Sequence, residues 1–440
     1  MSKMTRRTFL AGSTVIVVGG CATPGAGKAK PRKTSANDKL NIAGVGAGGK
    51  GNTDVRAVSR QNNIVCLCDV DDKRAAETYA LFPNAKKYKD FRVMLEKENK
   101  NIDAVTISTP DHMHAPIAMA CMEMGKHVFV QKPLTHDIFE ARRLMETARR
   151  YKVATHMGNQ GHAGEGVRRV TEWMEAGVIG QVHTVYCWTN RPIWPQPVAK
   201  PTETQPIPET LDWDLWVGTA EMRPYNQCYL PHNWRGFWDF GCGALGDMGC
   251  HIMDPAYTSL KLGLPISVEA EQEGNTDYSG PKWSMITYGF PGRGSMPPVK
   301  LIWCDGGKEP PFPESVPMEE RAKFGDSDKC GTLFVGDKGM VTCDTYGDSP
   351  RLVPYAKPNV PKRLPTSPGH YVEWIEACKG GEPAKGNFDY AGPFTEMVLL
   401  GNVAIRAGQK ICWDSEAMKV TNVPEANKYI KREYRKGYKS

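Results

Sequence analysis

The 440-residue chain lacks several features that mark common classes of protein. Its thirteen cysteines form no C-x-x-C pair and have no histidine-flanked spacing, so the sequence carries no zinc signature and predicts no metal site. It has no internal repeat, no G-x-S-x-G turn and no evident pair of close carboxylates. A serine hydrolase or a two-carboxylate glycosidase is therefore not indicated.

Most of the chain also lacks an excess of charge of either sign. Residues 1–40 hold eight Lys or Arg and one Asp, which accounts for the whole net charge of +7. The other 400 residues balance, so the basic composition gives no support to a nucleic-acid partner. Residues 421–440 form a short basic C-terminal tail, which we expect to be solvated.

The N-terminal segment has the pattern of an export signal. Arg6-Arg7 is a twin-arginine pair, and the apolar run at 11–20 is too short for a permanent membrane span, which needs about 20 apolar residues. Val18-Gly-Gly-Cys21 resembles a lipobox, in which Cys21 would be lipidated. We expect 1–38 to be signal and flexible tether, and the protein to be periplasmic or a membrane-anchored lipoprotein; a Sec-type signal without lipid is the alternative.

A glycine-rich turn follows this segment and predicts dinucleotide binding. An apolar run leads into Gly44-x-Gly46-x-x-Gly49, with Gly48 and Lys50 in the same turn, and a plausible helix comes next. Such glycines allow a tight turn, approach of the backbone to a pyrophosphate and close packing of helix on strand. Asp69, twenty residues after Gly49, ends a second apolar run and favours NAD over NADP. A glycine-rich turn without a ligand is the alternative.

Strand and helix patterns alternate over residues 39–160, which predicts a doubly wound, parallel Rossmann domain. The strands are expected near 39–46, 64–69, 103–109, 127–131 and 153–158, with helices near 49–60, 72–81, 90–98, 114–124 and 137–150. Residues 161–420 contain mainly strand patterns, so we expect a second, α+β domain with one large, mostly antiparallel sheet. Its strands are expected at 182–189, 267–272, 284–290, 299–304, 331–335 and 339–345.

Tryptophan is concentrated in one irregular stretch of the second domain. Six of the eleven tryptophans lie between positions 188 and 238. They are either core residues or aromatic platforms for a sugar, and the sequence leaves both open. We expect Trp234 and Arg235 in this stretch to contact substrate.

Three further motifs indicate a family. They are Ser108-Thr109-Pro110-Asp111-His112-Met113-His114, Gln131-Lys132-Pro133 and Asp247-x-x-x-His251. With the glycine turn, they resemble the glucose–fructose oxidoreductase/inositol 2-dehydrogenase (Gfo/Idh/MocA) family over nearly all of 39–420. The chain is also similar to NAD-dependent glycosidases related to that family. The family pattern has Glu where this chain has Gln131, which leaves its pH behaviour and substrate open.

The resemblance implies roles for individual residues. Lys132, Asp247 and His251 match the catalytic set, and Thr109, Pro110 and His114 would line the nicotinamide side. Gln131 and Asn159 would contact the cofactor, and His162 would contact cofactor or substrate. For Asn159 and His162, a turn or capping role is equally open. If 245–260 is helical, Asp247 and His251 share one face, and the carboxylate can orient the imidazole. A structural histidine, or a metal held with Asp254, are the alternatives.

These patterns predict an NAD-dependent oxidoreductase that acts on a hydroxyl of a sugar or glycoside and recycles a tightly held cofactor. One alternative is a glycosidase that works by transient oxidation at C3 followed by elimination. Another is a non-catalytic carbohydrate-binding lipoprotein. We expect a small carbohydrate as ligand, no nucleic acid, membrane contact only through the lipid, and a homo-oligomer formed through the C-terminal sheet.

Overall fold

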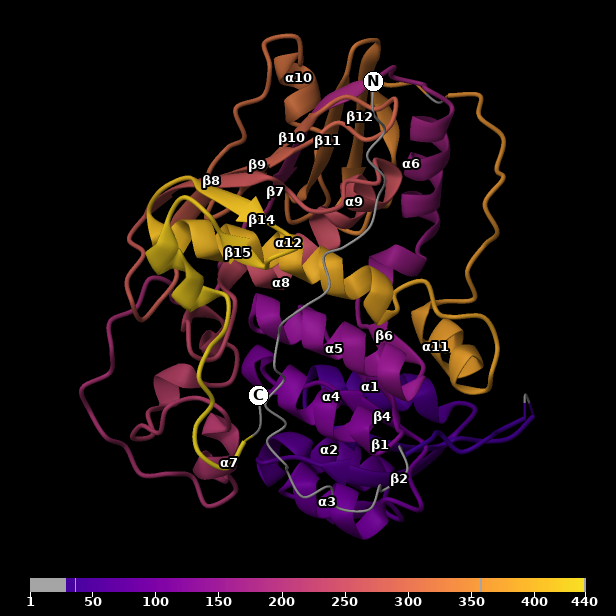
Figure 1. Ribbon diagram of the computed structural model, residues 1–440, viewed down its shortest axis with the longest axis vertical. Helices are drawn as coiled ribbons and strands as arrows, with labels where there is room; N and C mark the ends of the chain where they lie inside the picture. Colours follow the sequence, from indigo (N-terminus) through magenta and orange to yellow (C-terminus); the bar gives the residue numbers. More distant parts are fainter. Residues whose placement is uncertain (1–28, 36, 357, 439–440) are drawn as a thin grey trace, which may run out of the picture.

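The computed structural model describes residues 29–35, 37–356 and 358–438. The twin-arginine pair and Cys21 therefore lie outside the described residues. Two β-sheets occupy opposite ends of the long axis in Figure 1, the N-terminal one below and the C-terminal one above. No helix within the described ranges is long and apolar enough to cross a membrane.

The N-terminal sheet has six parallel strands in the order β3-β2-β1-β4-β5-β6. They are β1 (Asn41–Val45), β2 (Asn63–Cys68), β3 (Lys86–Tyr88), β4 (Ala104–Ile107), β5 (His127–Val130) and β6 (Thr155–Met157). Both β4 and β5 are buried at every residue, as expected where helices cover both faces of a parallel sheet. The strand order reverses between β1 and β4, which opens a ligand crevice at the carboxyl ends of the strands.

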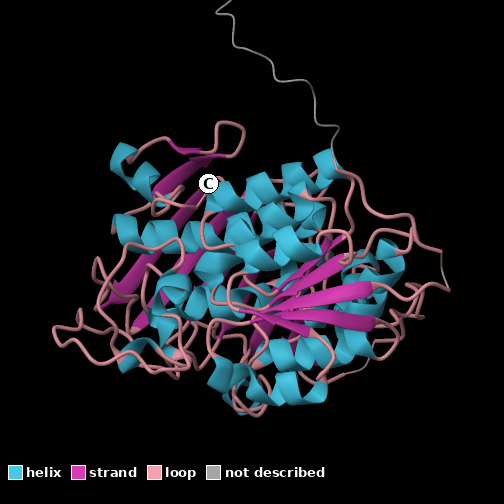
Figure 2. Ribbon diagram, turned by 90° about the horizontal axis from the view of Figure 1, so that it is seen from below, coloured by secondary structure: helices cyan, strands magenta, loops and turns pink. Residues whose placement is uncertain are grey.

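Five helices connect these strands. They are α1 (Lys50–Ser59), α2 (Asp72–Leu81), α3 (Phe91–Glu98), α4 (His114–Glu123) and α5 (Ile138–Tyr151). Figure 2 shows the strands fanning out between layers of helices. Side chains of Asp71, Asp90 and Asp137 accept hydrogen bonds from first-turn backbone N–H groups, so local capping fixes where α2, α3 and α5 begin. The predicted doubly wound Rossmann fold is confirmed.

The C-terminal sheet has nine strands in the order β13-β12-β11-β7-β10-β9-β8-β14-β15. They are β7 (Val182–Trp188), β8 (Ser267–Glu273), β9 (Trp283–Phe290), β10 (Val299–Cys304), β11 (Gly331–Gly336), β12 (Gly339–Asp344), β13 (Arg351–Val353), β14 (Ile411–Asp414) and β15 (Lys419–Val420). Of its neighbouring pairs, β10 with β7 is parallel and the rest are antiparallel. One large, mostly antiparallel sheet is confirmed.

The helix α12 (Phe388–Ala407) joins the two regions. It packs against α5 on one side and against β8 of the upper sheet on the other, and Figure 1 shows it crossing the middle of the molecule. Its buried face includes Phe394, Leu399 and Val403, which belong to a hydrophobic core shared by both regions. The relative position of the two sheets is thus fixed by apolar packing.

Apart from one 3₁₀ turn between β4 and α4, the remaining helices lie in the C-terminal region and its loops. They are α6 (Glu165–Glu175), α7 (Trp213–Val217), α8 (Gly243–Ile252), α9 (Asp254–Ser259), α10 (Met318–Arg321), α11 (His370–Cys378) and the 3₁₀ turns η1 (Asp111–Met113), η2 (Gln160–Ala163), η3 (Gln227–Tyr229), η4 (Asn233–Gly236) and η5 (Pro424–Tyr429). The single helix expected at 245–260 is wrong. Pro255 lies in the first turn of α9, where a backbone N–H has no partner within the helix, so the missing N–H of proline leaves no hydrogen bond unmade. The chain therefore forms two helices, α8 and α9, with a break between them.

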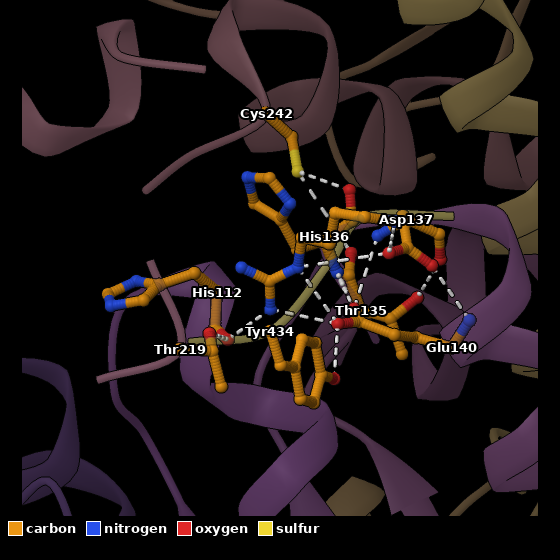
Figure 3. A network of polar contacts seen from close by, with 9 residues as sticks. His112, Thr135, His136, Asp137, Glu140, Thr219, Cys242 and Tyr434 are labelled. Atoms are coloured by element: carbon orange, nitrogen blue, oxygen red, sulfur yellow. Dashed lines mark hydrogen bonds and ion pairs between the residues drawn. The ribbon is translucent and has the colours of Figure 1, made fainter. Parts of the chain in front are cut away.

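The expectation of a solvated C-terminal tail is also wrong. The Arg432 guanidinium donates to Glu140 (Nη2–Oε1 2.8 Å) and its backbone N–H donates to Asp137 (3.1 Å). Tyr434 donates to the same Glu140 oxygen, and Figure 3 shows Asp137, Glu140 and Tyr434 in this polar network. The tail docks because two buried carboxylates at the start of α5 need a cation close by.

Candidate active site

The glycine turn between β1 and α1 is closed too tightly for side chains. A Cβ on Gly46, whose φ is +79°, would lie 2.6 Å from the Ser108 carbonyl oxygen. A Cβ on Gly51 would lie 1.6 Å from the Gly46 carbonyl oxygen. The turn therefore packs backbone against backbone, and it leaves the N-terminus of α1 uncovered for an anion.

The predicted glycines divide into two groups. Gly46, Gly48 and Lys50 line a cavity of about 430 Å³, whereas Gly44 and Gly49 do not. A Cβ on Gly44 would lie 2.7 Å from the Val55 side chain, so this glycine allows α1 to pack on β1. Gly49 is the N-cap of α1 at a φ of +57° and serves the turn itself.

Asp69 lies at the end of β2 and braces the turn. One carboxylate oxygen accepts the backbone N–H groups of Ala47 (2.7 Å) and Gly48 (3.0 Å), and the other accepts the N–H of Asp71 (3.0 Å). Burial raises the pKa of Asp69, and these three N–H groups oppose that shift. A carboxylate has about four lone-pair sites, so these contacts leave one unused, and Asp69 lines the cavity where the predicted ribose contact would form.

Two cations lie beside the turn. Lys50 and Arg74 both line the cavity, and a Cβ on Gly49 would lie 3.1 Å from the Arg74 guanidinium. Positive charge next to free backbone N–H groups suits a pyrophosphate. Arg74 was not predicted from the sequence, although its position in the helix after Asp69 was a usable signal.

The buried carboxylate of Asp54 connects four parts of the site. It accepts hydrogen bonds from Lys50 (2.8 Å), Tyr371 (2.6 Å), Ser108 (2.7 Å) and Gln131 (2.8 Å). The sequence analysis missed it, though its i,i+4 spacing to Lys50 was a signal. Gln131 lines the cavity and donates its amide to this carboxylate, so an amide here avoids the repulsion that a Glu would bring.

The loop after β4 brings Thr109 and Pro110 into the cavity wall as expected. The buried Thr109 hydroxyl has no hydrogen-bond partner among the described residues. His114 does not line the cavity, which contradicts its expected place. Its ring nitrogens face the carbonyl oxygens of Pro133 (2.8 Å) and Thr109 (2.9 Å), so it ties together the loops that follow β4 and β5.

Lys132, Asp247 and Arg235 form one ion-pair group in the cavity wall. The Lys132 ammonium donates to the Asp247 carbonyl oxygen (2.6 Å) and to its Oδ1 (2.9 Å), while Arg235 Nε donates to the same Oδ1 (3.1 Å). Burial opposes ionisation of Asp247, but the two cations outweigh it and lower its pKa below the usual range. Two of the three N–H bonds of Lys132 are thus used, and one remains for a substrate oxygen.

His251 is held by Asn159, not by Asp247 as expected. The Asn159 amide donates to the Cys250 carbonyl oxygen (2.7 Å), which turns its Oδ1 toward His251 Nδ1 (2.8 Å). The Nδ1 atom therefore carries the proton, and Nε2 keeps its lone pair. Burial lowers the pKa of His251, as does Lys132, so the ring is neutral. Asp247 and His251 do share one cavity wall on α8.

Three other predicted contacts, His162, Asn159 and Trp234, differ in where the structure places them. His162 does not line the cavity: its Nδ1 contacts Asp254 (3.0 Å) and its ring stacks on Tyr390 at 4.1 Å. Asn159 is buried behind His251 and also lies outside the cavity lining, so it positions the imidazole. Trp234 does line the cavity, next to Arg235.

The tryptophan-rich stretch supplies both core and cavity wall. Trp213, Trp216 and Trp234 are buried in one aromatic cluster, and Trp216 and Trp234 also line the cavity. The core interpretation therefore holds for these residues, and the sugar-platform interpretation stays a prediction for Trp216 and Trp234. Tyr346, whose ring lies 5.0 Å from that of His251, is a cavity residue that the sequence analysis missed.

The whole cavity runs from the glycine turn to His251 and fits a dinucleotide. Its walls offer a helix N-terminus with Lys50 and Arg74, a carboxylate at Asp69 and the unpartnered hydroxyl of Thr109. These are the groups that a pyrophosphate, a ribose and an amide-bearing ring can use. Among the described residues, no cluster of three or more His, Cys, Asp or Glu is placed to hold a metal ion.

Two family models match the chain. Residues 39–159 match "Oxidoreductase family, NAD-binding Rossmann fold", and residues 170–295 match "Oxidoreductase family, C-terminal alpha/beta domain", both of the GFO_IDH_MocA family. Residues 39–159 therefore form an NAD-binding Rossmann domain, which confirms the cofactor prediction.

Similar proteins include sugar-related enzymes. The myo-inositol 2-dehydrogenase of Thermotoga maritima is 26% identical over 132 residues, 30% of this chain and 39% of that protein. A glycosyl hydrolase family 109 protein of Shewanella pealeana is 27% identical over 156 residues, 33% of this chain and 34% of that protein. The chain thus spans well under half of the length of these relatives.

The fold is shared with solved structures over most of the chain. The WlbA dehydrogenase of Bordetella pertussis, solved with NADH and UDP-GlcNAcA, superposes with a TM-score of 0.61 at 17% identity. The match covers 86% of this chain and 99% of that one. At this identity the likeness concerns the fold.

Proposed function

The chain belongs to the GFO_IDH_MocA oxidoreductase family, and we propose on that premise that it oxidises a hydroxyl of a sugar or glycoside with NAD. The observation that carries the proposal is the grouping of Lys132, Asp247 and His251 on one cavity with the glycine turn. Bound NAD would be held by Gly46, Gly48, Lys50, Asp69 and Thr109, and it supplies the hydride acceptor.

The chain's own residues supply the proton chemistry. His251 Nε2 is an acceptor in a neutral, oriented ring, so it can take the proton of a substrate hydroxyl. The free N–H of Lys132 stabilises the negative charge that develops on that oxygen. Asp247 and its partner Arg235 fix the ammonium in place, and the buried wall keeps bulk water away.

We further propose that the cofactor stays bound between turnovers, so that a second sugar, in its carbonyl form, takes the hydride back from the bound nicotinamide before the next cycle. The stretch that leads into α7 lies over the adenosine side of the crevice: the Asp72 N–H donates to the Thr210 carbonyl oxygen (3.0 Å), and the Asp212 N–H donates to that of Val70 (2.8 Å). Tyr438 of the tail lines the same end of the cavity. Both segments come from outside the Rossmann domain and would have to move before a dinucleotide could leave.

A redox-assisted glycosidase is the second candidate. The similarity to a glycosyl hydrolase family 109 protein favours this glycosidase function, which would use the same residues. Transient oxidation at C3 acidifies the C2 proton, and His251, a neutral base in the same cavity, can remove that proton as the leaving group departs. A product assay separates the two functions, because the first yields a keto-sugar and the second a free aglycone.

The catalytic assignment predicts how variants behave. Lys132→Ala and His251→Ala should each lower kcat by about 10²-fold or more, while NAD occupancy stays close to wild type, since the glycine turn is untouched. Asp247→Asn should cost less, because the Asp247 backbone carbonyl still holds Lys132. Turnover on a panel of sugars and glycosides, with mass spectrometry of released nucleotide, measures both effects.

The outcomes separate the hypotheses. Near-wild-type turnover in His251→Ala would contradict the proton-acceptor role. Retained NAD without turnover of any sugar would instead favour the carbohydrate-binding protein.

We propose export to the periplasm with a lipid on Cys21. The twin-arginine pair and the residues before Cys21 support it, because that export route carries proteins folded around a cytoplasmic cofactor. Cys21→Ser should move the protein from the membrane to the soluble fraction, with Cys228→Ser as the control. A wild-type protein that is already soluble would contradict the lipidation.

We also propose that the protein forms homo-oligomers through the C-terminal sheet, since alternate residues of β9 are partly exposed.

A further inference from the structure

Three basic side chains surround the cavity near His251. Lys132, Arg191 and Arg235 all line it, and their side chains are only 15%, 18% and 24% exposed. Cations held this far from water need nearby negative charge. The proton chemistry proposed above uses Lys132 and, through Asp247, one N–H of Arg235; it makes no use of Arg191.

The carboxylates at this end do not balance these cations. Asp247 supplies one negative charge, and Lys132 and Arg235 share it. The other cavity carboxylate here, Asp111, accepts the Cys242 backbone N–H (3.1 Å) and forms no ion pair with these cations among the described residues. His232 adds no charge, because burial and then Arg235 lower its pKa.

Arg235 presents a fixed guanidinium edge. Its plane lies over the Trp234 ring at 4.3 Å, and its Nε donates to Asp247. Its Nη1 contacts His232, and its Nη2 has no acceptor among the described residues. A stacked guanidinium loses little freedom when it binds an anion.

Arg191 follows β7, and its backbone is held on both sides. Its N–H donates to Thr189 Oγ1 (3.3 Å) and its carbonyl accepts from Gly306 (2.6 Å). Its one carboxylate contact is with Asp328 (3.3 Å), whose side chain is 55% exposed and screened by water. Arg191 Nε has no acceptor in the part of the chain that is described.

Arg191 and the reacting end of the cavity are close. The Tyr346 ring lies 5.0 Å from that of His251, and Tyr346 and His251 line the same cavity as Arg191. Arg235 also lies over the Trp194 ring at 5.9 Å, three residues after Arg191. The two arginines thus belong to one continuous wall.

We propose that this cavity takes a sugar with an anionic substituent, a carboxylate or a phosphate, bound by Arg191 and Arg235. The proposal rests on the oxidoreductase function above. Arg191 Nη1 donates to the Asn190 side-chain oxygen and Nη2 to Asp328, so its Nε and the Nη2 of Arg235 are the atoms that can donate to the oxygens of either anion. Charge-assisted hydrogen bonds in a half-buried site are strong. The hydroxyl to be oxidised then lies between Lys132 and His251.

Matched sugars test the proposal on the full, NAD-loaded protein. Glucose, glucuronic acid and glucose 6-phosphate differ at C6 only, so calorimetry and steady-state turnover isolate the anionic group. We expect at least one anionic sugar to bind about 10-fold or more tightly than glucose, with the advantage falling as salt rises. The two anionic arms show whether carboxylate or phosphate is the group recognised.

Variants of Arg191 locate the contact. Arg191→Gln should weaken binding and raise the KM of the anionic sugar by about 10-fold or more, leave the values for glucose unchanged, and alter kcat little. Arg191→Lys should restore part of the loss. Arg143→Gln removes the same charge from an exposed site on α5 and should change nothing.

Each result decides between the claims. The anionic-substrate inference is wrong, and the oxidoreductase function stands, if glucose is oxidised with the same kcat/KM as the anionic sugars. The same conclusion follows if Arg191→Gln changes the values for glucose and for the anionic sugars by the same factor. If an anionic sugar binds tightly through Arg191 but no sugar is oxidised, the inference stands and the proposed function fails. If no sugar binds, both are wrong.

Discussion

At the scale of single residues, the site depends on which partner holds each polar side chain. His251 is kept neutral by burial and by the charge of Lys132, while Asp247 acts in the opposite direction. The same ammonium that stabilises a developing alkoxide thus also keeps the neighbouring imidazole available as a base. Lys132 can have both effects only if the lysine and the histidine are close together and not hydrogen-bonded to each other.

This arrangement predicts a shift in the pKa of His251. Lys132→Met removes the charge and keeps the length of the side chain, so the pKa of His251 should rise toward the usual histidine value of about 6.5. The base would then be protonated over a wider acidic range, and residual activity should fall off at higher pH than in wild type. Histidine NMR titration and the pH profile of kcat/KM measure the shift.

Lys73→Met, on exposed α2, is the matched control and should leave the titration unchanged. An unchanged His251 titration in Lys132→Met would show that burial alone sets its protonation.

The sequence predicted the members of this group but not their contacts. Spacing of four placed Asp247 and His251 on one helix face, and α8 confirms the helix there. It could not show that Asn159, 92 residues before His251, would take the imidazole, because that contact depends on how η2 packs on α8. Asp54 was missed for the same reason, because three of its four partners, Ser108, Gln131 and Tyr371, come from distant segments.

At the scale of elements, the Rossmann strands were predictable because buried parallel strands are short, continuous apolar runs. Short edge strands were not. β3 is Lys-Lys-Tyr and largely exposed, and β15 has two residues, so each exists through pairing with a neighbour and not through its own pattern. The docked tail was missed because its partners, Asp137 and Glu140, look like ordinary capping residues of α5.

The tail and α7 act together at the adenosine end of the crevice. Arg435 donates to the Gly218 carbonyl (2.9 Å) and to the Asp214 side chain (2.6 Å), which links the tail to the end of α7. Three residues on, Tyr438 lines the cavity. A cover built from two segments that hold each other should open less often than either alone.

We therefore predict that Arg435→Ala speeds the release of NAD. Loss of the charge-assisted link should raise the dissociation rate by about 10-fold, with turnover per bound NAD nearly unchanged, because the reacting end is intact. Exchange of bound nucleotide during gel filtration or against labelled NAD measures the rate. Lys436→Ala, an exposed neighbour in the same tail, should release NAD at the wild-type rate; equal rates in all three proteins would show that the tail does not retain the cofactor.

At the scale of the whole molecule, the site exists only while the two sheets keep their relative position. The glycine turn and Lys132 come from the N-terminal region, and Asp247, His251 and Tyr346 come from the C-terminal one. A buried ion pair between Arg142 of α5 and Glu396 of α12 (2.7 Å) ties them together. Conditions that loosen the core between the regions should therefore abolish activity and cofactor binding together.

Acid is one such condition, because the fold buries many neutral histidines. Burial is the largest cause of a lowered pKa in seven histidines: His112, His127, His136, His156, His232, His251 and His370. Below pH of about 6.5 the unfolded chain binds protons that the folded chain does not, so stability is lost as the pH falls. Burial also raises the pKa of six carboxyl groups, Asp69, Asp111, Asp137, Asp305, Asp344 and Asp348, and these groups act in the opposite direction and offset part of the loss.

We predict that the free energy of unfolding falls steeply between pH 6.5 and 5, by about 1.4 kcal/mol per pH unit for each histidine that stays neutral in the folded state. Urea unfolding at several pH values measures the slope. His156→Gln, at a site whose pKa is lowered to about 4, should flatten it by one proton, whereas exposed His183→Gln should not change it. A flat profile from pH 7 to 5 would mean that the buried histidines gain protons without unfolding, and the tightly packed core between the two sheets would then have to admit charge.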